Sequence, residues 1–180
     1  MLKVTLTESL VDEADKLAKD MGRIRNSITK GEGNIAGFIG EIVCAKLFNA
    51  ERKGTKDYDL VLPDGKTVDV KTKRTTVKPL LHYDCSVAKL SLHQKCDAYA
   101  FCRVKTDLSV CWFLGLVDHD QYFKNARFLT KGELDPANNF TVKSDCYNVS
   151  IEKLKELQST HEYLRREVIR NEKGITPTSS

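Results

Sequence analysis

The chain has 180 residues and a net charge of +4, with 41% hydrophobic and 30% charged residues. This composition is typical of a globular protein with a hydrophobic core and argues against a disordered or fibrous chain. No apolar run approaches the length of a membrane span, and the N-terminus lacks a signal-peptide core. We therefore expect a cytoplasmic protein with no membrane partner, a single domain over residues 1–170 and a disordered tail at 171–180.

Two helices are predicted in the first fifty residues. Residues 8–20 place apolar side chains on one face at helical spacing, which predicts an amphipathic helix. A polar connector follows at residues 21–33. Residues 34–49 are mostly apolar and begin with Asn34, a residue type that favours the N-cap of a helix.

Glu41 lies in the second predicted helix, on a stripe of mainly small residues made of Gly37, Glu41, Cys44, Ala45 and Phe48. A stripe of small residues lets a helix approach a sheet closely, which would explain two glycines that each cost about 1 kcal/mol in a helix. A glutamate on that stripe would be partly buried. Because a buried carboxylate is costly unless it is paired or binds a metal, Glu41 is a candidate site residue.

A β-hairpin is predicted at residues 58–73, Tyr-Asp-Leu-Val-Leu-Pro-Asp-Gly-Lys-Thr-Val-Asp-Val-Lys-Thr-Lys. Side chains alternate between the two faces of a strand, so Asp69 and Lys71 share a face. A two-residue loop at the turn would place the carboxylates of Asp59 and Asp69 on opposite faces. A three-residue loop, Pro63-Asp64-Gly65, would place them directly opposite each other on one face.

The turn residues favour the longer loop, because proline suits its first corner and Gly65 suits a left-handed position. Asp59 and Asp69 would then repel each other and need a cation.

The rest of the chain predicts shorter elements and a cysteine-containing core. The six cysteines include no Cys-x-x-Cys pair, which indicates buried, reduced thiols and not structural zinc. The final amphipathic helix leaves open either packing on the sheet edge or a homodimer contact. The expected elements are a third strand (81–87), a short helix or turn (89–95), two buried strands (97–104 and 110–117), a short helix (118–126), a loop-like region (130–145), a short strand (147–150) and a final helix from residue 151.

The order of Glu41 on a helix, Asp59 on a strand and Asp69-x-Lys71 on the next strand resembles the PD-(D/E)XK nuclease superfamily. The resemblance is specific over residues 34–75 and architectural over 81–118. It implies an α/β (α+β) fold with a restriction-endonuclease-like core, a mixed central β-sheet flanked by helices in the order αβββαβ, plus an N-terminal helix and a C-terminal helical extension. One departure is Tyr58 in place of the proline in the superfamily's name, which leaves Asp57 as a rival ligand.

The resemblance implies a role for each site residue. Asp59 and Asp69 would bind Mg²⁺, or Mn²⁺, with Glu41 as a further ligand, and carboxylate oxygens suit such hard cations. Lys71 would assist the attacking water and stabilise charge on the phosphate. Gln94 is a weaker auxiliary candidate.

Lys and Arg outnumber Asp between residues 52 and 78, as expected for a protein that acts on a polyanion. We therefore expect a metal-dependent nuclease, most simply a DNA endonuclease. One alternative is a nucleic-acid-binding module with the same fold and no catalysis. Another is an unrelated α+β protein whose hairpin matches by chance. The residues expected to contact nucleic acid are Lys66, Lys73, Arg74 and Lys78.

Overall fold

The computed structural model describes residues 1–21, 34–136 and 139–157. The connector after residue 21, the end of the final helix and the tail at 171–180 lie outside these residues. Within them the chain forms a mixed α+β structure, as predicted.

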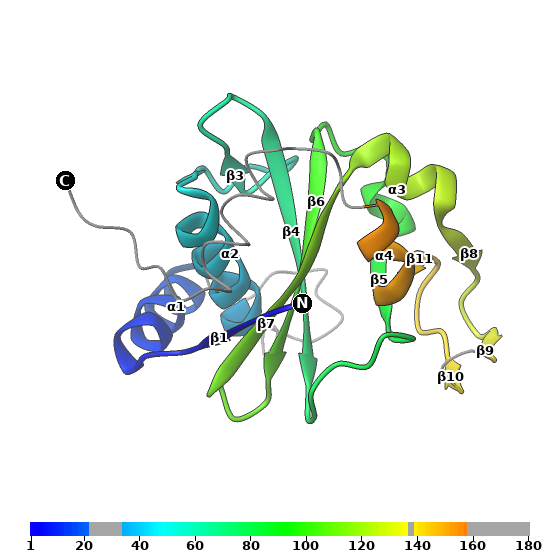
Figure 1. Cartoon of the computed structure of the whole chain (residues 1–180), viewed down its shortest axis with the longest axis horizontal. Helices are drawn as coiled ribbons and strands as arrows, with labels where there is room; N and C mark the ends of the chain where they lie inside the picture. The colour runs from blue at the N-terminus through cyan, green and yellow to red at the C-terminus, as the bar shows by residue number, and fades with distance from the viewer. Residues whose placement is uncertain (22–33, 137–138, 158–180) are drawn as a thin grey trace.

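A six-stranded mixed sheet forms the centre of the molecule (Figure 1). Only β4 and β6 are parallel, and every other neighbouring pair is antiparallel. The two strands predicted at 97–104 and 110–117 are confirmed as β6 and β7. In spatial order the strands are β1 (Leu2–Thr5), β7 (Val110–Asp118), β6 (Ala98–Lys105), β4 (Thr67–Thr75), β3 (Leu60–Val61) and β2 (Glu51–Arg52).

Different layers cover the two faces of this sheet (Figure 1). Helices α1 (Glu8–Met21) and α2 (Asn34–Phe48), both predicted, cover one face. A second sheet covers the other face in the order β5 (Asp84–Ala88), β11 (Cys146–Ser150), β8 (Arg127–Leu129). Helices α3 (His119–Asn125) and α4 (Ile151–Leu157) pack with it. The short elements are the 3₁₀ helix η1 (Lys89–His93) and the pair β9 (Leu134–Asp135) and β10 (Phe140–Thr141).

The alternation of side chains along β4 separates two hydrophobic cores. Val68 and Val70 point into the core beneath α2, which includes Ile39, Val43 and Phe48. Asp69 lies on the opposite face of β4, as do Lys71 and Lys73, which reach the layer that contains η1 and β5. The second core, built on aromatic residues, continues on that side with Tyr99, Phe101, Trp112, Tyr122 and Leu154.

Helix α2 approaches β4 closely at Gly40, where a methyl group would lie 2.0 Å from Thr72 Oγ1. Gly37 has no atom within 4 Å of the corresponding position. The expectation that a glycine permits close packing is therefore confirmed, but the predicted stripe was wrong in including Gly37. The helix faces the sheet through Gly40 and the larger side chains of Ile39 and Val43, because apolar residues cover so much of its surface that spacing alone did not identify the buried face.

Two further predictions need correction. The strand expected at 81–87 begins at Asp84 and pairs with β11 in the second sheet, so it does not extend the hairpin. The third strand next to the hairpin is β2, which precedes it in the chain. Strand β1 was not predicted at all. The pairings of β1 with β7 and of β5 with β11 join segments distant in sequence, which local patterns do not specify.

The six cysteines are free, and all but Cys146 are buried, as predicted. No helix within the described parts of the chain is long and apolar enough to cross a membrane.

Candidate functional site

The hairpin that carries the candidate carboxylates has the predicted three-residue loop. Leu60 pairs with Val68, and Val61 pairs with Thr67. The Gly65 amide donates to the Leu62 carbonyl (2.9 Å), and Gly65 has a φ of +87°, the left-handed conformation that the turn requires. The loop length and register inferred from the sequence are therefore confirmed.

Asp59 lies beside Asp69, immediately before β3 begins. Its amide donates to the Val68 carbonyl (3.0 Å), and its carboxylate oxygen Oδ2 accepts from the Val70 amide (2.7 Å). Asp59 thus contacts both neighbours of Asp69 along β4. The register of the hairpin places Asp59 opposite Asp69, as expected, although β3 itself begins only at Leu60.

Asp69, Lys71 and Gln94 form one contact group, and Asp69 is nearly buried, with 7% of its side chain exposed. Lys71 Nζ lies 2.6 Å from Asp69 Oδ2 and donates to Gln94 Oε1 (3.2 Å). Gln94 Nε2 in turn donates to Asp69 Oδ1 (2.9 Å). Gln94 therefore holds the acid and the lysine in one arrangement, and Lys71 also lies over the Tyr99 ring, 5.7 Å from its centre.

Glu41 is paired with an arginine that the sequence interpretation did not include. Arg52 Nη2 donates to Glu41 Oε2 (3.0 Å), and the Arg52 guanidinium lies 5.7 Å from the centre of the Phe38 ring. Arg52 belongs to β2, which follows α2 after a short turn. The only sequence signal for this pair was proximity in the chain, which does not distinguish Arg52 from its neighbour Lys53.

The three carboxylates influence one another electrostatically. Burial and the charges of Asp69 and Glu41 raise the pKa of Asp59 from 3.8 to about 7. Burial also raises the pKa of Glu41, although the hydrogen bond from Arg52 opposes that change. Burial is the largest cause of both raised pKa values, and the repulsion expected between Asp59 and Asp69 adds to it at Asp59.

The four basic residues predicted to bind nucleic acid do not share one surface. Lys73 points toward the second sheet, where its Nζ donates to Ser86 Oγ (2.6 Å). Arg74 follows it on the strand and is exposed on the other face of β4. Lys66 lies at the end of the turn, and Lys78 is exposed beyond β4. The rival ligand Asp57 accepts a long hydrogen bond from the Lys95 amide (3.5 Å).

The fit of a metal ion can be tested on these atoms. Within residues 1–21, 34–136 and 139–157, no group of three or more His, Cys, Asp or Glu side chains is arranged to hold a metal. Asp69 Oδ2 is buried and forms an ion pair with Lys71 Nζ (2.6 Å), but it accepts no hydrogen bond within those residues. The carboxylate oxygens of Asp59, Asp69 and Glu41 are of the kind that bind a hard cation. They are not already arranged around one point, since Lys71 forms an ion pair with Asp69 and Arg52 forms one with Glu41.

Comparison with known proteins adds no assignment. No protein-family model matches the sequence, and a search of curated proteins finds no match.

Proposed function

We propose that this chain is a metal-dependent nuclease that hydrolyses phosphodiester bonds of nucleic acid, most simply a DNA endonuclease. The observation that carries the proposal is the contact group of Asp69, Lys71 and Gln94 beside Asp59. It combines the nearly buried Asp69, the ammonium of Lys71 in contact with it, and Asp59, whose pKa is raised by burial and by the charges of Asp69 and Glu41. Excess negative charge beside a fixed cation suits a site that takes a divalent ion and a phosphate.

The connectivity around the site supports a restriction-endonuclease-like core. Helix α2 is followed by the antiparallel strands β2, β3 and β4, and then by β6, which runs parallel to β4. This resembles the αβββαβ order, except that the crossover between β4 and β6 contains both β5, which joins the second sheet, and the short 3₁₀ helix η1, which lies where a short helix or turn was expected. The candidate acids lie immediately before β3, on β4 and on α2, which suits the order in the resemblance.

The residues of the chain would act in distinct ways. Asp59, Asp69 and Glu41 would hold Mg²⁺ or Mn²⁺, which supplies a polarised phosphate and a bound water of lowered pKa. Lys71 would place its ammonium where negative charge develops on the phosphate, and would release Asp69 in doing so. Gln94 would keep Lys71 positioned, because it contacts both Lys71 and Asp69. Arg52 would hold Glu41 in place.

A second candidate function is nucleic-acid binding without catalysis. It is favoured by the same ion pairs, since Lys71 and Arg52 already compensate Asp69 and Glu41 in the described parts of the chain. Binding of Mg²⁺ separates the two candidates, because a binding module has no use for the ion.

The test combines cleavage with metal binding. Supercoiled, linear, single-stranded and branched DNA, together with a matched RNA, are incubated with the protein in Mg²⁺, Mn²⁺ or EDTA. We expect cleavage that needs metal and that is lost in Asp69→Asn. Calorimetric titration of Mg²⁺ into wild type and Asp69→Asn gives the matched binding measurement. A protein that binds nucleic acid but takes up no metal and cuts none of these substrates is the binding module.

A further inference from the structure

A cavity of about 670 Å³ lies between the main sheet and the second sheet, and Lys71 is one of the residues that line it. One wall is the face of β4 and β6 that carries Lys71, Lys73, Phe101 and Arg103. The opposite wall comes from β5 and β11, and the segment 140–144 closes one side. Its volume lies within the range of ligand pockets, about 300–1,000 Å³.

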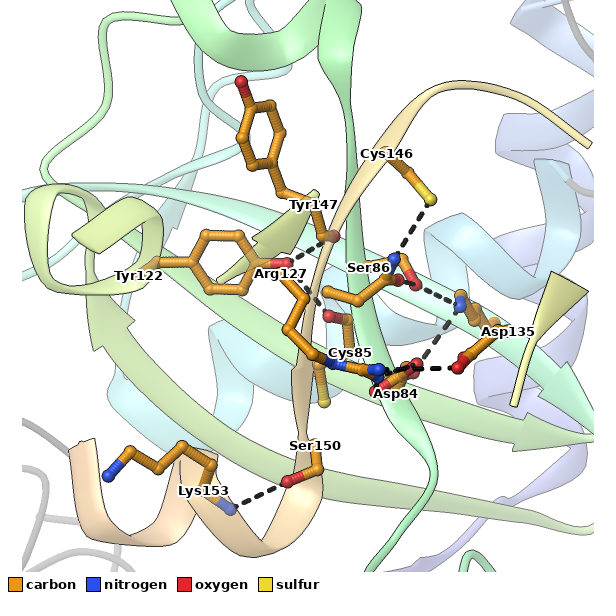
Figure 2. A network of polar contacts seen from close by, with 12 residues as sticks. Asp84, Cys85, Ser86, Tyr122, Arg127, Asp135, Cys146, Tyr147, Ser150 and Lys153 are labelled. Carbon is orange, nitrogen blue, oxygen red and sulfur yellow. Dashed lines mark hydrogen bonds and ion pairs between the residues drawn. The ribbon is translucent and has the colours of Figure 1, made fainter. Parts of the chain in front are cut away.

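Two cations stand side by side on the sheet wall, because Lys73 of β4 pairs in register with Arg103 of β6. Their bonding partners are neutral. Lys73 Nζ donates to Ser86 Oγ (2.6 Å), and Arg103 Nη2 donates to the Asp84 carbonyl (3.0 Å). The Asp84 carboxylate is instead bound by Arg127, which also reaches Asp135 (Figure 2). Neither Lys73 nor Arg103 forms an ion pair with a carboxylate of the described residues.

The surroundings of the two cations are unfavourable for charge. Burial lowers the pKa of Lys73, and the nearby charge of Arg103 lowers it further. Burial also lowers the pKa of Arg103. Arg103 Nε is buried and lacks a hydrogen-bond acceptor within the described residues. By solvent exposure Lys73 is exposed and Arg103 half-buried, and Asp84, which is bound by Arg127, is the nearby negative charge that partly offsets both. An anion between the two cations would relieve their remaining repulsion and supply an acceptor for the buried Arg103 Nε.

We propose that this cavity binds a phosphate group through Lys73 and Arg103, and that the phosphate belongs to a nucleic-acid strand whose scissile phosphate lies at Lys71. The planar guanidinium of Arg103 can donate two hydrogen bonds side by side, and the flexible ammonium of Lys73 can donate to a further oxygen. Together they suit a phosphate group, which has several oxygen acceptors. The apolar side chains of Phe101, Leu114 and Phe140 in the same cavity offer surface to a base or sugar. The second half of the proposal rests on the proposed function, whereas the first half does not.

The competing explanation is structural. Lys73 and Arg103 both reach β5, so they could serve only to join the two sheets. A structural role predicts that loss of either cation lowers stability and leaves anion binding unchanged. A phosphate site predicts that loss of either cation weakens phosphate binding, while stability in phosphate-free buffer is retained or raised because the repulsion is gone.

The first experiment measures thermal unfolding in EDTA with inorganic phosphate replacing chloride at constant ionic strength. We expect phosphate to raise the midpoint of wild type, as a ligand of the folded state does. In Lys73→Gln and in Arg103→Gln the apparent Kd for phosphate should rise about tenfold or more, the size of a lost charge-assisted hydrogen bond. Lys46→Gln, on the exposed surface of α2, makes the same charge change away from the cavity and should bind as wild type does. Equal phosphate stabilisation of all four proteins overturns the proposal.

A second measurement uses only wild type, in case a variant does not fold. An amine-acylating reagent labels Lys73, and mass spectrometry reads its modification with and without phosphate. Protection of Lys73 relative to Lys46 supports the site, and equal labelling of Lys73 in both buffers overturns it.

The third measurement identifies the source of the phosphate. Short oligonucleotides of one sequence, with a 5′-phosphate, a 3′-phosphate or neither, are compared with a mononucleotide. Tighter binding of a phosphorylated strand than of the mononucleotide, lost in Arg103→Gln, supports the nucleic-acid source. Phosphate and mononucleotide binding without strand binding overturns that source and leaves the phosphate site. Cleavage of DNA at wild-type rate and affinity by Arg103→Gln overturns the cavity proposal and leaves the nuclease intact.

Discussion

The two faces of β4 have opposite character, since one is apolar and closely packed and the other carries charged side chains. On the face toward α2, Val68, Val70 and Thr72 pack so tightly that Gly40 leaves no room for a methyl group. On the face toward the second sheet, Asp69, Lys71 and Lys73 meet polar partners and a cavity of about 670 Å³. Strand alternation lets one face stabilise the fold while the other holds charges in place, and the second task costs stability wherever like charges are buried together.

The largest expected effect is on the free energy of unfolding, when the charge of Asp59 is removed. The raised pKa of Asp59 means that the folded state favours its protonated form. That contribution to stability is fully present below the unfolded pKa of 3.8, and it is lost as the pH rises through about 7. Asp59→Asn cannot ionise and keeps an oxygen for the Val70 amide. We expect the variant to gain stability over wild type by up to about 4 kcal/mol between pH 4 and pH 8.

Urea unfolding at pH 4, 6 and 8 in EDTA measures this difference. Asp57→Asn, two residues away, is the matched control, because it retains Asp59 and should therefore lose stability between pH 4 and pH 8 as wild type does. A stability difference between Asp59→Asn and wild type that is the same at pH 4 and pH 8 contradicts the prediction.

The next largest effect tests whether Lys71 acts on the chemistry or only on binding. Lys71→Met should reduce single-turnover cleavage by about 10²–10³-fold, the size of one lost electrostatic contact to the transition state. Its affinity for DNA should fall much less, because Lys73 and Arg103 remain. A salt series of binding curves beside the cleavage rates measures both. If the bound Lys71→Met complex cleaves at the normal rate, Lys71 is only an anchor for the phosphate.

A matched pair of glycines tests the packed face. Gly40→Ala and Gly37→Ala gain the same helix propensity, but only the first pushes a methyl group into Thr72. We expect Gly40→Ala to be less stable than Gly37→Ala by about 1–3 kcal/mol, the usual cost of overpacking. Denaturant unfolding of both variants gives the difference, and equal stabilities would mean that α2 can move away from β4 at no cost.

The smallest effect concerns Gln94. Gln94→Ala removes neutral hydrogen bonds worth about 0.5–1.5 kcal/mol each, so cleavage should slow by about tenfold. Because Gln94 orients Lys71, the loss should appear in the cleavage rate of bound DNA and not in DNA affinity. Gln94→Glu keeps an acceptor for Lys71 but places a carboxylate beside Asp69, so it should bind Mg²⁺ differently from Gln94→Ala. Wild-type cleavage by both variants removes the positioning role.

The sequence by itself determined the parts of the site that depend on neighbouring residues. Pro63 and Gly65 specify the turn, the turn specifies the register, and strand alternation then places Asp69 and Lys71 on one face. The same reasoning identified α1, α2, β6 and β7, because their patterns are long enough to specify element type.

Tertiary structure decided everything that joins distant segments. Strand β5 follows the hairpin in sequence, but it pairs with β11 some sixty residues later, and so builds the second wall of the cavity. Arg103 lies beside Lys73 because β6 runs parallel to β4. Glu41 and Arg52 are close in the chain, but the pairing of β2 with β3 at the sheet edge fixes the position of Arg52. No local pattern encodes such meetings, since they follow from the packing of whole layers and from the burial of charge that the packing enforces.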